Sequence, residues 1–175
     1  MSTETLNLKA YIRDIPDFPK AGILFRDVTP LLADKTALAQ AVSALAEPFK
    51  NDRIDYVAAV EARGFIFGSA VAKELNAGFI PLRKKGKLPY TTESVTYQLE
   101  YGTDTIEVHS DAMKSGDRVL MLDDLLATGG TMSAGCQLVK KLGVQIAGLT
   151  FLIELTDLAG RQKLPDYPIH TVMAF

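Results

Sequence analysis

Three segments of the sequence begin with a short, almost wholly apolar run that leads into polar turn residues. The runs lie at 56–60, 118–122 and 146–153, and the first two are followed by helical patterns at 65–75 and 132–142. None of the three runs alternates polar and apolar residues, so each is expected to be a strand that is buried on both faces. The alternation of strands and helices predicts an α/β protein with an open, mostly parallel, twisted sheet flanked by helices.

Shorter segments complete this layout. A further strand is expected at 79–82, and further helices are expected at 6–13 and 36–49. A chain of 175 residues that is 47% hydrophobic and 23% charged is long enough to bury one core. We therefore expect a single domain over residues 1–175.

Two segments interrupt the alternation of strands and helices. Residues 16–27 are rich in Pro and Gly but also carry large apolar side chains. Residues 83–105 form a long connection that opens with a basic cluster. Long connections inside compact α/β domains are usually functional or mobile.

The charge and the reactive residues of the chain exclude several classes of function. Its 19 Lys and Arg residues against 21 Asp and Glu residues leave a formal net charge of -2, which argues against a nucleic-acid-binding protein. The single Cys136 excludes an internal disulfide framework and a cysteine-based zinc cluster. Two histidines, His109 and His170, are too few for a His-rich metal site.

The sequence also carries no targeting or membrane signal that we recognise. Residues 1–10 lack the basic segment and apolar run of a signal peptide. The longest nearly apolar stretch, 146–153, is far shorter than the roughly 20 residues that a membrane helix needs. We therefore expect a cytoplasmic protein with no membrane partner.

The turn at 127–131, which we call the phosphate turn, is the most informative stretch of the chain. The adjacent Gly129 and Gly130 leave the backbone unobstructed, so that several amide N–H groups can converge on one anion. Thr128 and Thr131 add hydroxyl donors, and the helix that follows adds its positive N-terminus. Neither the Walker A sequence nor the Gly-x-Gly-x-x-Gly fingerprint is present. The turn therefore predicts a site for a terminal phosphate.

Asp123 and Asp124, the acidic pair, directly precede the phosphate turn. Two carboxylates would repel a bare polyphosphate, but they accept hydrogen bonds from neighbouring hydroxyls. A sugar phosphate satisfies both parts of the site, with its phosphate in the turn and its hydroxyls on the acidic pair. The alternative is an acidic pair that holds Mg²⁺ or simply faces solvent.

The stretch 119–131 resembles the phosphoribosyl pyrophosphate signature of the type I phosphoribosyltransferases. The segments that are similar to the adenine-specific branch of that family are 16–19, 22–27, 61–68, 83–89 and 97–102. The resemblance extends over about 12–164. It implies the fold of that family, with a small N-terminal hood over 12–30 and a long flexible catalytic loop over 83–105.

The resemblance implies a specific reaction. An enzyme of this branch transfers the 5-phosphoribosyl group from phosphoribosyl pyrophosphate to adenine, giving AMP and pyrophosphate in purine salvage. The cofactor implied is Mg²⁺, held mainly by the substrate, so no protein metal ligand is assigned. The resemblance also implies a homodimer, and neither nucleic acid nor membrane is expected as a partner.

The resemblance also assigns residues to phosphoribosyl pyrophosphate. The 5'-phosphate is expected to bind to Ala127, Thr128, Gly129, Gly130 and Thr131; the ribose hydroxyls to Asp123 and Asp124; and the pyrophosphate to Arg63, Arg83 and Lys84. The alternative for the two basic residues at 83 and 84 is a solvated loop. Relatives often have a non-proline cis peptide bond in the turn that contains Arg63. The sequence does not decide whether this chain has one.

Adenine is expected to lie under the hood. Phe25 offers a ring for stacking, and the backbones of Leu24 and Arg26 read the edge of the base. The alternative for Phe25 is a core residue. Glu100 is the expected general acid–base, a role that contributes roughly 10²–10⁴-fold in rate. Tyr97 and Tyr101 either cover the site or pack in a hairpin.

Two other functions remain as alternatives. A close relative of this branch uses hypoxanthine or guanine in place of adenine. A second alternative is a non-catalytic regulator that senses phosphoribosyl pyrophosphate and binds nucleic acid. The acidic balance of the chain and its single-domain length disfavour the regulator, and the retained Glu100 favours catalysis.

Overall fold

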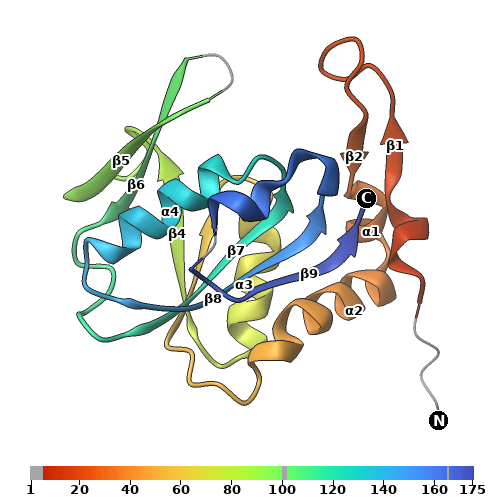
Figure 1. The fold of residues 1–175 in the computed structure, drawn as a ribbon. Helices are drawn as coiled ribbons and strands as arrows, with labels where there is room; N and C mark the ends of the chain where they lie inside the picture. Colours follow the sequence, from red (N-terminus) through yellow and green to blue (C-terminus); the bar gives the residue numbers. More distant parts are fainter. Residues whose placement is uncertain (1–5, 100–101, 165) are drawn as a thin grey trace.

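The structure is a computed structural model that describes residues 6–99, 102–164 and 166–175. Within these residues, seven strands form one sheet in the order β5-β6-β4-β3-β7-β8-β9. Figure 1 shows this twisted sheet across the middle of the molecule, with helices on both sides. The parallel strands are β3 (Tyr56–Val60), β4 (Gly78–Lys84), β7 (Arg118–Leu126), β8 (Gln145–Glu154) and β9 (Ile169–Ala174).

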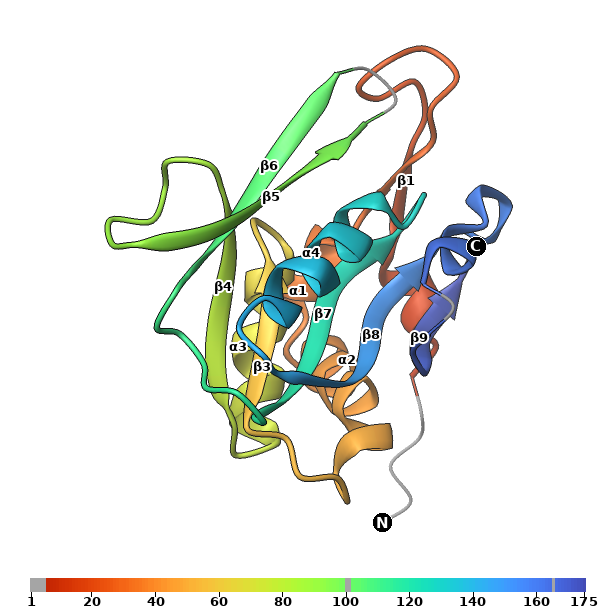
Figure 2. The ribbon, with the colours of Figure 1, turned by 60° about the vertical axis from the view of Figure 1, so that its left-hand side comes forward.

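The helices cover both faces of the sheet. On one face lie α1 (Thr29–Ala33), α2 (Lys35–Ala46) and α3 (Gly64–Glu74), and on the other lies α4 (Gly130–Lys140). Figure 2 shows α4 in front of the sheet and the other three helices behind it. This arrangement confirms the α/β fold expected from the sequence.

The central strand β3 explains why its sequence does not alternate. Val57 and Ala59 belong to the core cluster under α2 and α3, whereas Ala58 and Val60 belong to the cluster under α4. All four side chains are at most 4% exposed. A strand that is buried on both faces must be apolar at every position.

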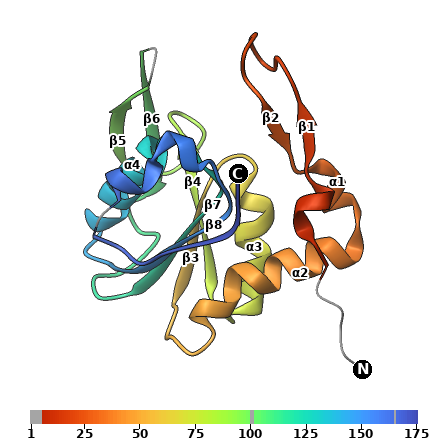
Figure 3. The same ribbon diagram turned by 45° about the vertical axis from the view of Figure 1, so that its right-hand side comes forward.

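Two antiparallel hairpins stand at the end of the sheet where β3 and β7 terminate. One consists of β1 (Arg13–Ile15) and β2 (Phe25–Asp27), which pair only with each other in the described chain. The other consists of β5 (Thr92–Gln98) and β6 (Thr103–His109), which joins the main sheet through β4. Figures 1 and 3 show the two hairpins rising on opposite sides of this end of the molecule.

Several predicted elements have the expected place. Strands 56–60 and 146–153 correspond to β3 and β8, and helices 65–75 and 132–142 correspond to α3 and α4 within two residues. The predicted helix at 36–49 consists of α2 followed by a short 3₁₀ turn, η2 (Glu47–Phe49).

Three predictions of local structure are wrong. The expected helix at 6–13 is only a 3₁₀ turn, η1 (Leu8–Tyr11), and Arg13 already begins β1. The expected loop at 83–105 contains β5 and the start of β6; side-chain burial alternates along β5, as it does in a strand with one covered face. The strand predicted at 118–122 continues to Leu126, so the acidic pair lies within β7.

Candidate active site

The candidate site lies where the parallel strands β3 and β7 end side by side. Val57 of β3 pairs with Leu120 of β7, and Ala59 pairs with Leu122. The chain after β3 returns to β4 on one side of this pair, whereas the chain after β7 continues to β8 on the other side. Ligands of open α/β sheets bind at such a reversal of strand order, beyond the carboxyl ends of the strands.

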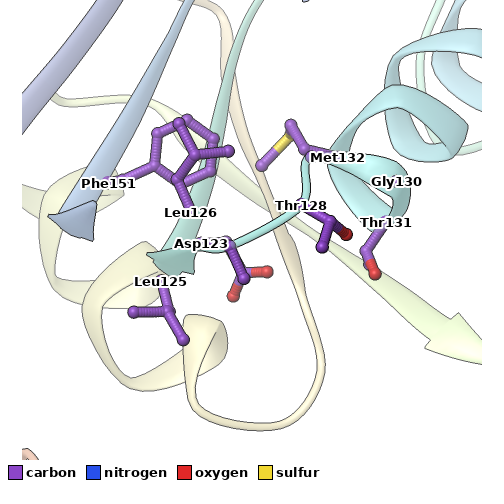
Figure 4. A pocket seen from close by; sticks show the side chains of 10 residues that line it. Asp123, Leu125, Leu126, Thr128, Gly130, Thr131, Met132 and Phe151 are labelled. Carbon is purple, nitrogen blue, oxygen red and sulfur yellow. The ribbon is translucent and has the colours of Figure 1, made fainter. Parts of the chain in front are cut away.

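The phosphate turn connects β7 to α4 and surrounds a small pocket of about 80 Å³. Gly129 has φ +78° and caps the N-terminus of α4, so the first amides of the helix point toward the pocket. Figure 4 shows the polar side chains of Asp123, Thr128 and Thr131 around this pocket. All five predicted residues of the turn line it, namely Ala127, Thr128, Gly129, Gly130 and Thr131.

A second and larger pocket of about 320 Å³ adjoins the first, and the two share Asp123, Leu125 and Thr131 in their walls. Its polar wall also contains Asp124, Arg63, Lys84, Glu61 and Tyr97. The structure thus brings the predicted phosphate turn, the acidic pair, Arg63 and Lys84 around one continuous cavity.

The acidic pair is held by buried contacts. Asp124 is 6% exposed, and its Oδ2 lies 2.7 Å from Nε of Arg63. Asp123 Oδ1 accepts a hydrogen bond from the backbone N–H of Asp124 at 2.9 Å. Burial raises the pKa of Asp123 well above its ordinary value, and the charge of Asp124 raises it further. Burial also raises the pKa of Asp124, although the charge of Arg63 opposes this effect. Hydroxyl donors or a cation would therefore stabilise both carboxylates.

Gly64, the first residue of α3, allows this arrangement. A Cβ atom at Gly64 would lie 2.8 Å from Asp123 Oδ1. The helix therefore approaches the acidic pair so closely that a side chain at this position would displace the carboxylate. This role of Gly64 was not predicted from the sequence, where a glycine directly after the turn residue Arg63 is the only signal for it.

Arg63 joins two parts of the site. Besides its ion pair with Asp124, its guanidinium lies 5.1 Å from the centre of the Phe25 ring in the hood. The Glu61–Ala62 peptide bond that precedes it is cis, which the sequence had left open. Arg63 is 37% exposed on its side chain and lines the larger pocket, so it remains accessible to a ligand.

Glu61 organises the basic cluster that follows β4. Its Oε2 accepts a hydrogen bond of 2.6 Å from Arg83, and its Oε1 lies 3.0 Å from Nζ of Lys87. Burial, the largest influence on its pKa, raises it, but the hydrogen bonds from Arg83 and Lys87 lower the pKa overall. No contact of Glu61 was predicted from the sequence, because its partners lie too far along the chain for spacing to reveal them.

Two neighbouring basic residues, Arg83 and Lys84, were predicted to bind pyrophosphate together with Arg63. Of these two, Lys84 lines the larger pocket and Arg83 does not. Lys84 Nζ lies 2.5 Å from Oδ2 of Asp104 on β6. The hydrogen bond that Lys84 donates to this carboxylate raises the pKa of Lys84. Arg83, Lys84 and Lys87 each have a carboxylate partner, so a purely solvated basic loop does not describe them.

The predicted base-binding residues lie on β2 and just before it. Phe25 is half-buried and meets Phe18 edge-on at 5.1 Å between ring centres; it belongs to neither core cluster, so the alternative of a core residue is wrong. Leu24 is 44% exposed. The Arg26 side chain pairs with Asp14 and lies over the ring of Phe175 at 4.3 Å.

The β5–β6 hairpin reaches the phosphate turn through Tyr97. Its hydroxyl accepts a hydrogen bond of 3.4 Å from Thr131 Oγ1, and its ring lines the larger pocket. The predicted catalytic residue Glu100 and its neighbour Tyr101 lie outside the described residues. Among the residues that are described, no group of three or more His, Cys, Asp and Glu side chains is arranged to hold a metal ion.

Fold and site together define a phosphoribosyl transferase, since a parallel sheet presents a glycine turn and an acidic pair at the ends of its strands. A family model described as "Phosphoribosyl transferase domain" matches residues 30–173. Adenine phosphoribosyltransferase from Methylobacterium nodulans is 54% identical, over 100% of this chain and 98% of its own. The one from Nitrosococcus oceani is 55% identical, over 96% of this chain and 98% of its own.

Solved structures agree with these relatives. The crystal structure of adenine phosphoribosyltransferase from Thermoanaerobacter pseudethanolicus superimposes with a TM-score of 0.93 at 50% identity, covering 96% of this chain and 98% of that one. The enzyme from Saccharomyces cerevisiae, complexed with an imino-altritol bisphosphate and adenine, superimposes with a TM-score of 0.90 at 38% identity. The superposition covers 94% of this chain and 96% of that one. This chain belongs to the adenine phosphoribosyltransferase family.

Proposed function

We propose that this protein transfers the 5-phosphoribosyl group of phosphoribosyl pyrophosphate to adenine, forming AMP and releasing pyrophosphate in purine salvage. The observation that carries the proposal is the continuous cavity at the ends of β3 and β7. It combines a backbone turn suited to a phosphate with an acidic pair suited to sugar hydroxyls.

The sugar phosphate is proposed to bind at the phosphate turn and the acidic pair. The backbone N–H groups of 127–131 and the hydroxyls of Thr128 and Thr131 donate to the 5'-phosphate. The ribose hydroxyls donate to Asp123 and Asp124, whose burial makes an incoming donor favourable.

The pyrophosphate is proposed to lie between Arg63 and Lys84 in the larger pocket. A ribose hydroxyl that donates to Asp124 replaces the hydrogen bond from Arg63, so the guanidinium becomes available to the anion. Arg83 is proposed to act on the same group less directly, because its Nε is committed to Glu61 at 2.6 Å.

Mg²⁺ fits this site as a cation held mainly by the substrate. The acidic pair presents carboxylate oxygens, the ligand type that Mg²⁺ prefers, and both carboxyl groups have raised pKa values that a nearby cation would counteract. When bound, the ion supplies positive charge that stabilises the departing pyrophosphate. Asp123 and Asp124 are the residues that would lie nearest to it.

Adenine is proposed to stack on Phe25 while the backbone at Leu24 and Arg26 reads its edge. Backbone readout separates adenine from guanine and hypoxanthine, because the 6-amino group donates a hydrogen bond where a 6-oxo group accepts one. The relatives from Saccharomyces cerevisiae and Giardia lamblia, whose solved complexes contain adenine and 9-deazaadenine, support a purine site of this kind.

Glu100 is proposed to manage the proton of the purine. As N9 of adenine bonds to the ribose carbon, positive charge develops on the ring, and the carboxylate of Glu100 accepts the proton that the purine loses. Most of the remaining acceleration comes from orientation of the two substrates and from stabilisation of the positively charged ribose and the leaving pyrophosphate.

The proposed function is tested by measuring pyrophosphate release with phosphoribosyl pyrophosphate, Mg²⁺ and each purine in turn. We expect turnover with adenine. Turnover with hypoxanthine or guanine but not adenine would transfer the assignment to that alternative, and no turnover with any purine would favour the regulator. Glu100→Gln is expected to lower kcat by about 10²–10⁴-fold with little change in substrate affinity; an unchanged kcat would remove Glu100 from this role.

We also propose that the protein is a cytoplasmic homodimer, as the family resemblance implies. Within the described residues, no helix has the length and apolar character to traverse a bilayer. Sedimentation equilibrium of the purified protein tests the dimer, and a monomer mass at micromolar concentration would contradict it.

A further inference from the structure

The segment 155–164, which we call the supporting segment, runs from the end of β8 toward β9 behind the phosphate turn. It contains two 3₁₀ turns, η3 (Thr156–Leu158) and η4 (Gly160–Lys163). It begins against β7, because the backbone N–H of Leu155 donates to the carbonyl of Leu126 at 2.9 Å. No residue of this segment is among those proposed to bind substrate or to act in catalysis.

The supporting segment meets the phosphate turn through close backbone contacts. A Cβ atom at Gly160 would clash with the carbonyl oxygen of Ala127 and would lie 3.1 Å from the backbone N of Gly129. A Cβ atom at Gly129 would in turn clash with the carbonyl oxygen of Gly160. The two glycines thus allow two chain segments to touch where no side chain fits, so the position of one segment determines that of the other.

An ion pair fixes the supporting segment to the sheet. Glu154, the last residue of β8, is 7% exposed and accepts two hydrogen bonds of 2.7 Å from Nε and Nη2 of Arg161. Thr171 on β9 donates to the same carboxylate at 3.1 Å, and Arg161 Nη1 donates to the carbonyl of Ile169 at 3.2 Å. Such a two-point arginine–carboxylate contact fixes orientation as well as distance. Arg161 directly follows Gly160, so the pair holds the glycine in place.

We infer that Glu154 and Arg161 are positioning residues for the 5'-phosphate site, acting through the backbone contact of Gly160 with the phosphate turn. The inference rests on the proposed function, which assigns the phosphate to that turn. The described residues that line the small phosphate pocket do not include Glu154, Gly160 or Arg161. The effect of these three residues on a ligand is therefore indirect.

The inference predicts which substrate is affected. The N–H groups of the phosphate turn must converge on one anion, and a displacement of the order of 1 Å at a reacting centre costs roughly 10²-fold. Loosening the support therefore weakens sugar-phosphate binding. Adenine is proposed to bind under the hood, which neither Glu154 nor Arg161 contacts through any described interaction.

The first experiment compares two glycine substitutions in steady-state kinetics. Gly160→Ala inserts a methyl group against the phosphate turn. Gly148→Ala is the matched control, because its Cβ would lie 2.6 Å from Phe49 Cε1 and 3.3 Å from the carbonyl oxygen of Pro168, at the far end of the same strand β8. We expect Gly160→Ala to raise KM for phosphoribosyl pyrophosphate about tenfold or more, with KM for adenine nearly unchanged. We expect Gly148→Ala to lower Tm without changing either KM.

The second experiment tests the ion pair with Arg161→Ala and Arg161→Lys. Lysine keeps the charge but offers no planar fork, so the KM for phosphoribosyl pyrophosphate should rise in the order wild type, Arg161→Lys, Arg161→Ala. Calorimetric titration with ribose 5-phosphate should show the same order of affinities, which makes the test independent of turnover. A fall in Tm of these variants with unchanged KM and unchanged ribose 5-phosphate affinity would mean that the pair is merely structural, and would overturn the inference.

The two proposals fail differently. Wild-type protein that does not turn over adenine would contradict the proposed function. Wild-type protein that turns over adenine, together with a Gly160→Ala variant of normal KM, would leave the function intact and contradict only the role of the supporting segment. If Arg161→Ala does not fold, Arg161→Lys and Gly160→Ala still decide the question.

Discussion

The phosphate turn is the proposed site of the 5'-phosphate and the hood is the proposed site of adenine, and the two regions are held in different ways. The turn is continuous with the central sheet and rests on the backbone of Gly160, with the Glu154–Arg161 ion pair behind it. The hood is a two-stranded hairpin that contacts the rest of the protein through side chains: Arg26 with Phe175, and Phe25 with Arg63.

This difference suits the two ligands. A phosphate is recognised by several donors that must converge on one centre, which requires a backbone with little freedom. A purine is recognised largely by stacking, which tolerates small shifts of the ring. We therefore expect substitutions at the turn to have large, substrate-specific effects, and substitutions at the hood to have smaller effects confined to the base.

The largest effect is expected for Gly129→Ala in the turn. Its φ of +78° strains any side chain, and its Cβ would also clash with Gly160. We expect the affinity for ribose 5-phosphate, measured by calorimetry, to fall about 100-fold. Gly22→Ala in the hood is the matched control, since Gly22 has φ +83° but nothing within 4 Å of its Cβ. If both variants bind ribose 5-phosphate equally, the contrast between the two regions is wrong.

A smaller effect is expected for Phe25→Ala in the hood. Loss of base stacking is worth about 1–3 kcal/mol, so KM for adenine should rise about tenfold. The ion pair of Arg63 with Asp124 remains, so KM for phosphoribosyl pyrophosphate should change little. Phe18→Ala, which removes only an edge contact with the Phe25 ring, should have a weaker effect. If Phe25→Ala changes KM for phosphoribosyl pyrophosphate more than KM for adenine, the assignment of the two regions is reversed.

Asp123→Asn is expected to separate stability from binding at the turn. Burial raises the pKa of Asp123 in the folded protein above its unfolded value. Ionisation therefore destabilises the fold increasingly as the pH rises above the unfolded pKa of about 4. Asparagine cannot ionise, and its Oδ1 can still accept the N–H of Asp124.

At neutral pH we expect Asp123→Asn to raise Tm by about 2–4 °C, and this gain should disappear below about pH 4. The same variant should bind ribose 5-phosphate more weakly. Thermal melts from pH 3 to 8 and calorimetry check both outcomes. A Tm gain that persists at pH 3 would mean that ionisation of Asp123 is not its cause.

The smallest effect is expected for Phe175→Leu. The ring of Phe175 lies 4.3 Å from the Arg26 guanidinium, a cation–π contact worth roughly 0.5–1 kcal/mol at a partly exposed site. Its loss should raise KM for adenine about two- to fourfold, because β2 is less firmly held. Phe175→Tyr keeps the ring and should behave like wild type. Equal kinetics of the Leu and Tyr variants would show that the contact does not support the hood.

The sequence predicted the buried framework better than the exposed segments. The strands at 56–60 and 146–153 were recognisable because burial on both faces requires an uninterrupted apolar run. The strands within 83–105 were not predicted, and a hairpin appeared only as one alternative for Tyr97 and Tyr101, since β5 has only one covered face and its polar positions resemble a loop. The extent of β7 was underestimated because its two carboxylates, although polar, lie within the strand, where Asp124 is buried and Asp123 is half-buried.

The site was predictable where its parts are consecutive in the chain. The phosphate turn and the acidic pair form one stretch, so their chemistry was visible at once. The pairs Glu61 with Arg83 and Glu154 with Arg161 were not visible, because only the fold brings the partners together. Gly160 was missed for the same reason: its requirement for glycine comes from the turn it touches, which lies about thirty residues away.

The position of the supporting segment also affects the order in which the site forms during synthesis. A ribosome releases the hood first, then β3, and the phosphate turn well before 155–164. A nascent chain that has released the turn but not Arg161 lacks the backbone contact behind it. The proposed role of the supporting segment implies that the phosphate site is complete only after Arg161 has left the ribosome. Substrate is then expected to stabilise the chain only after that point.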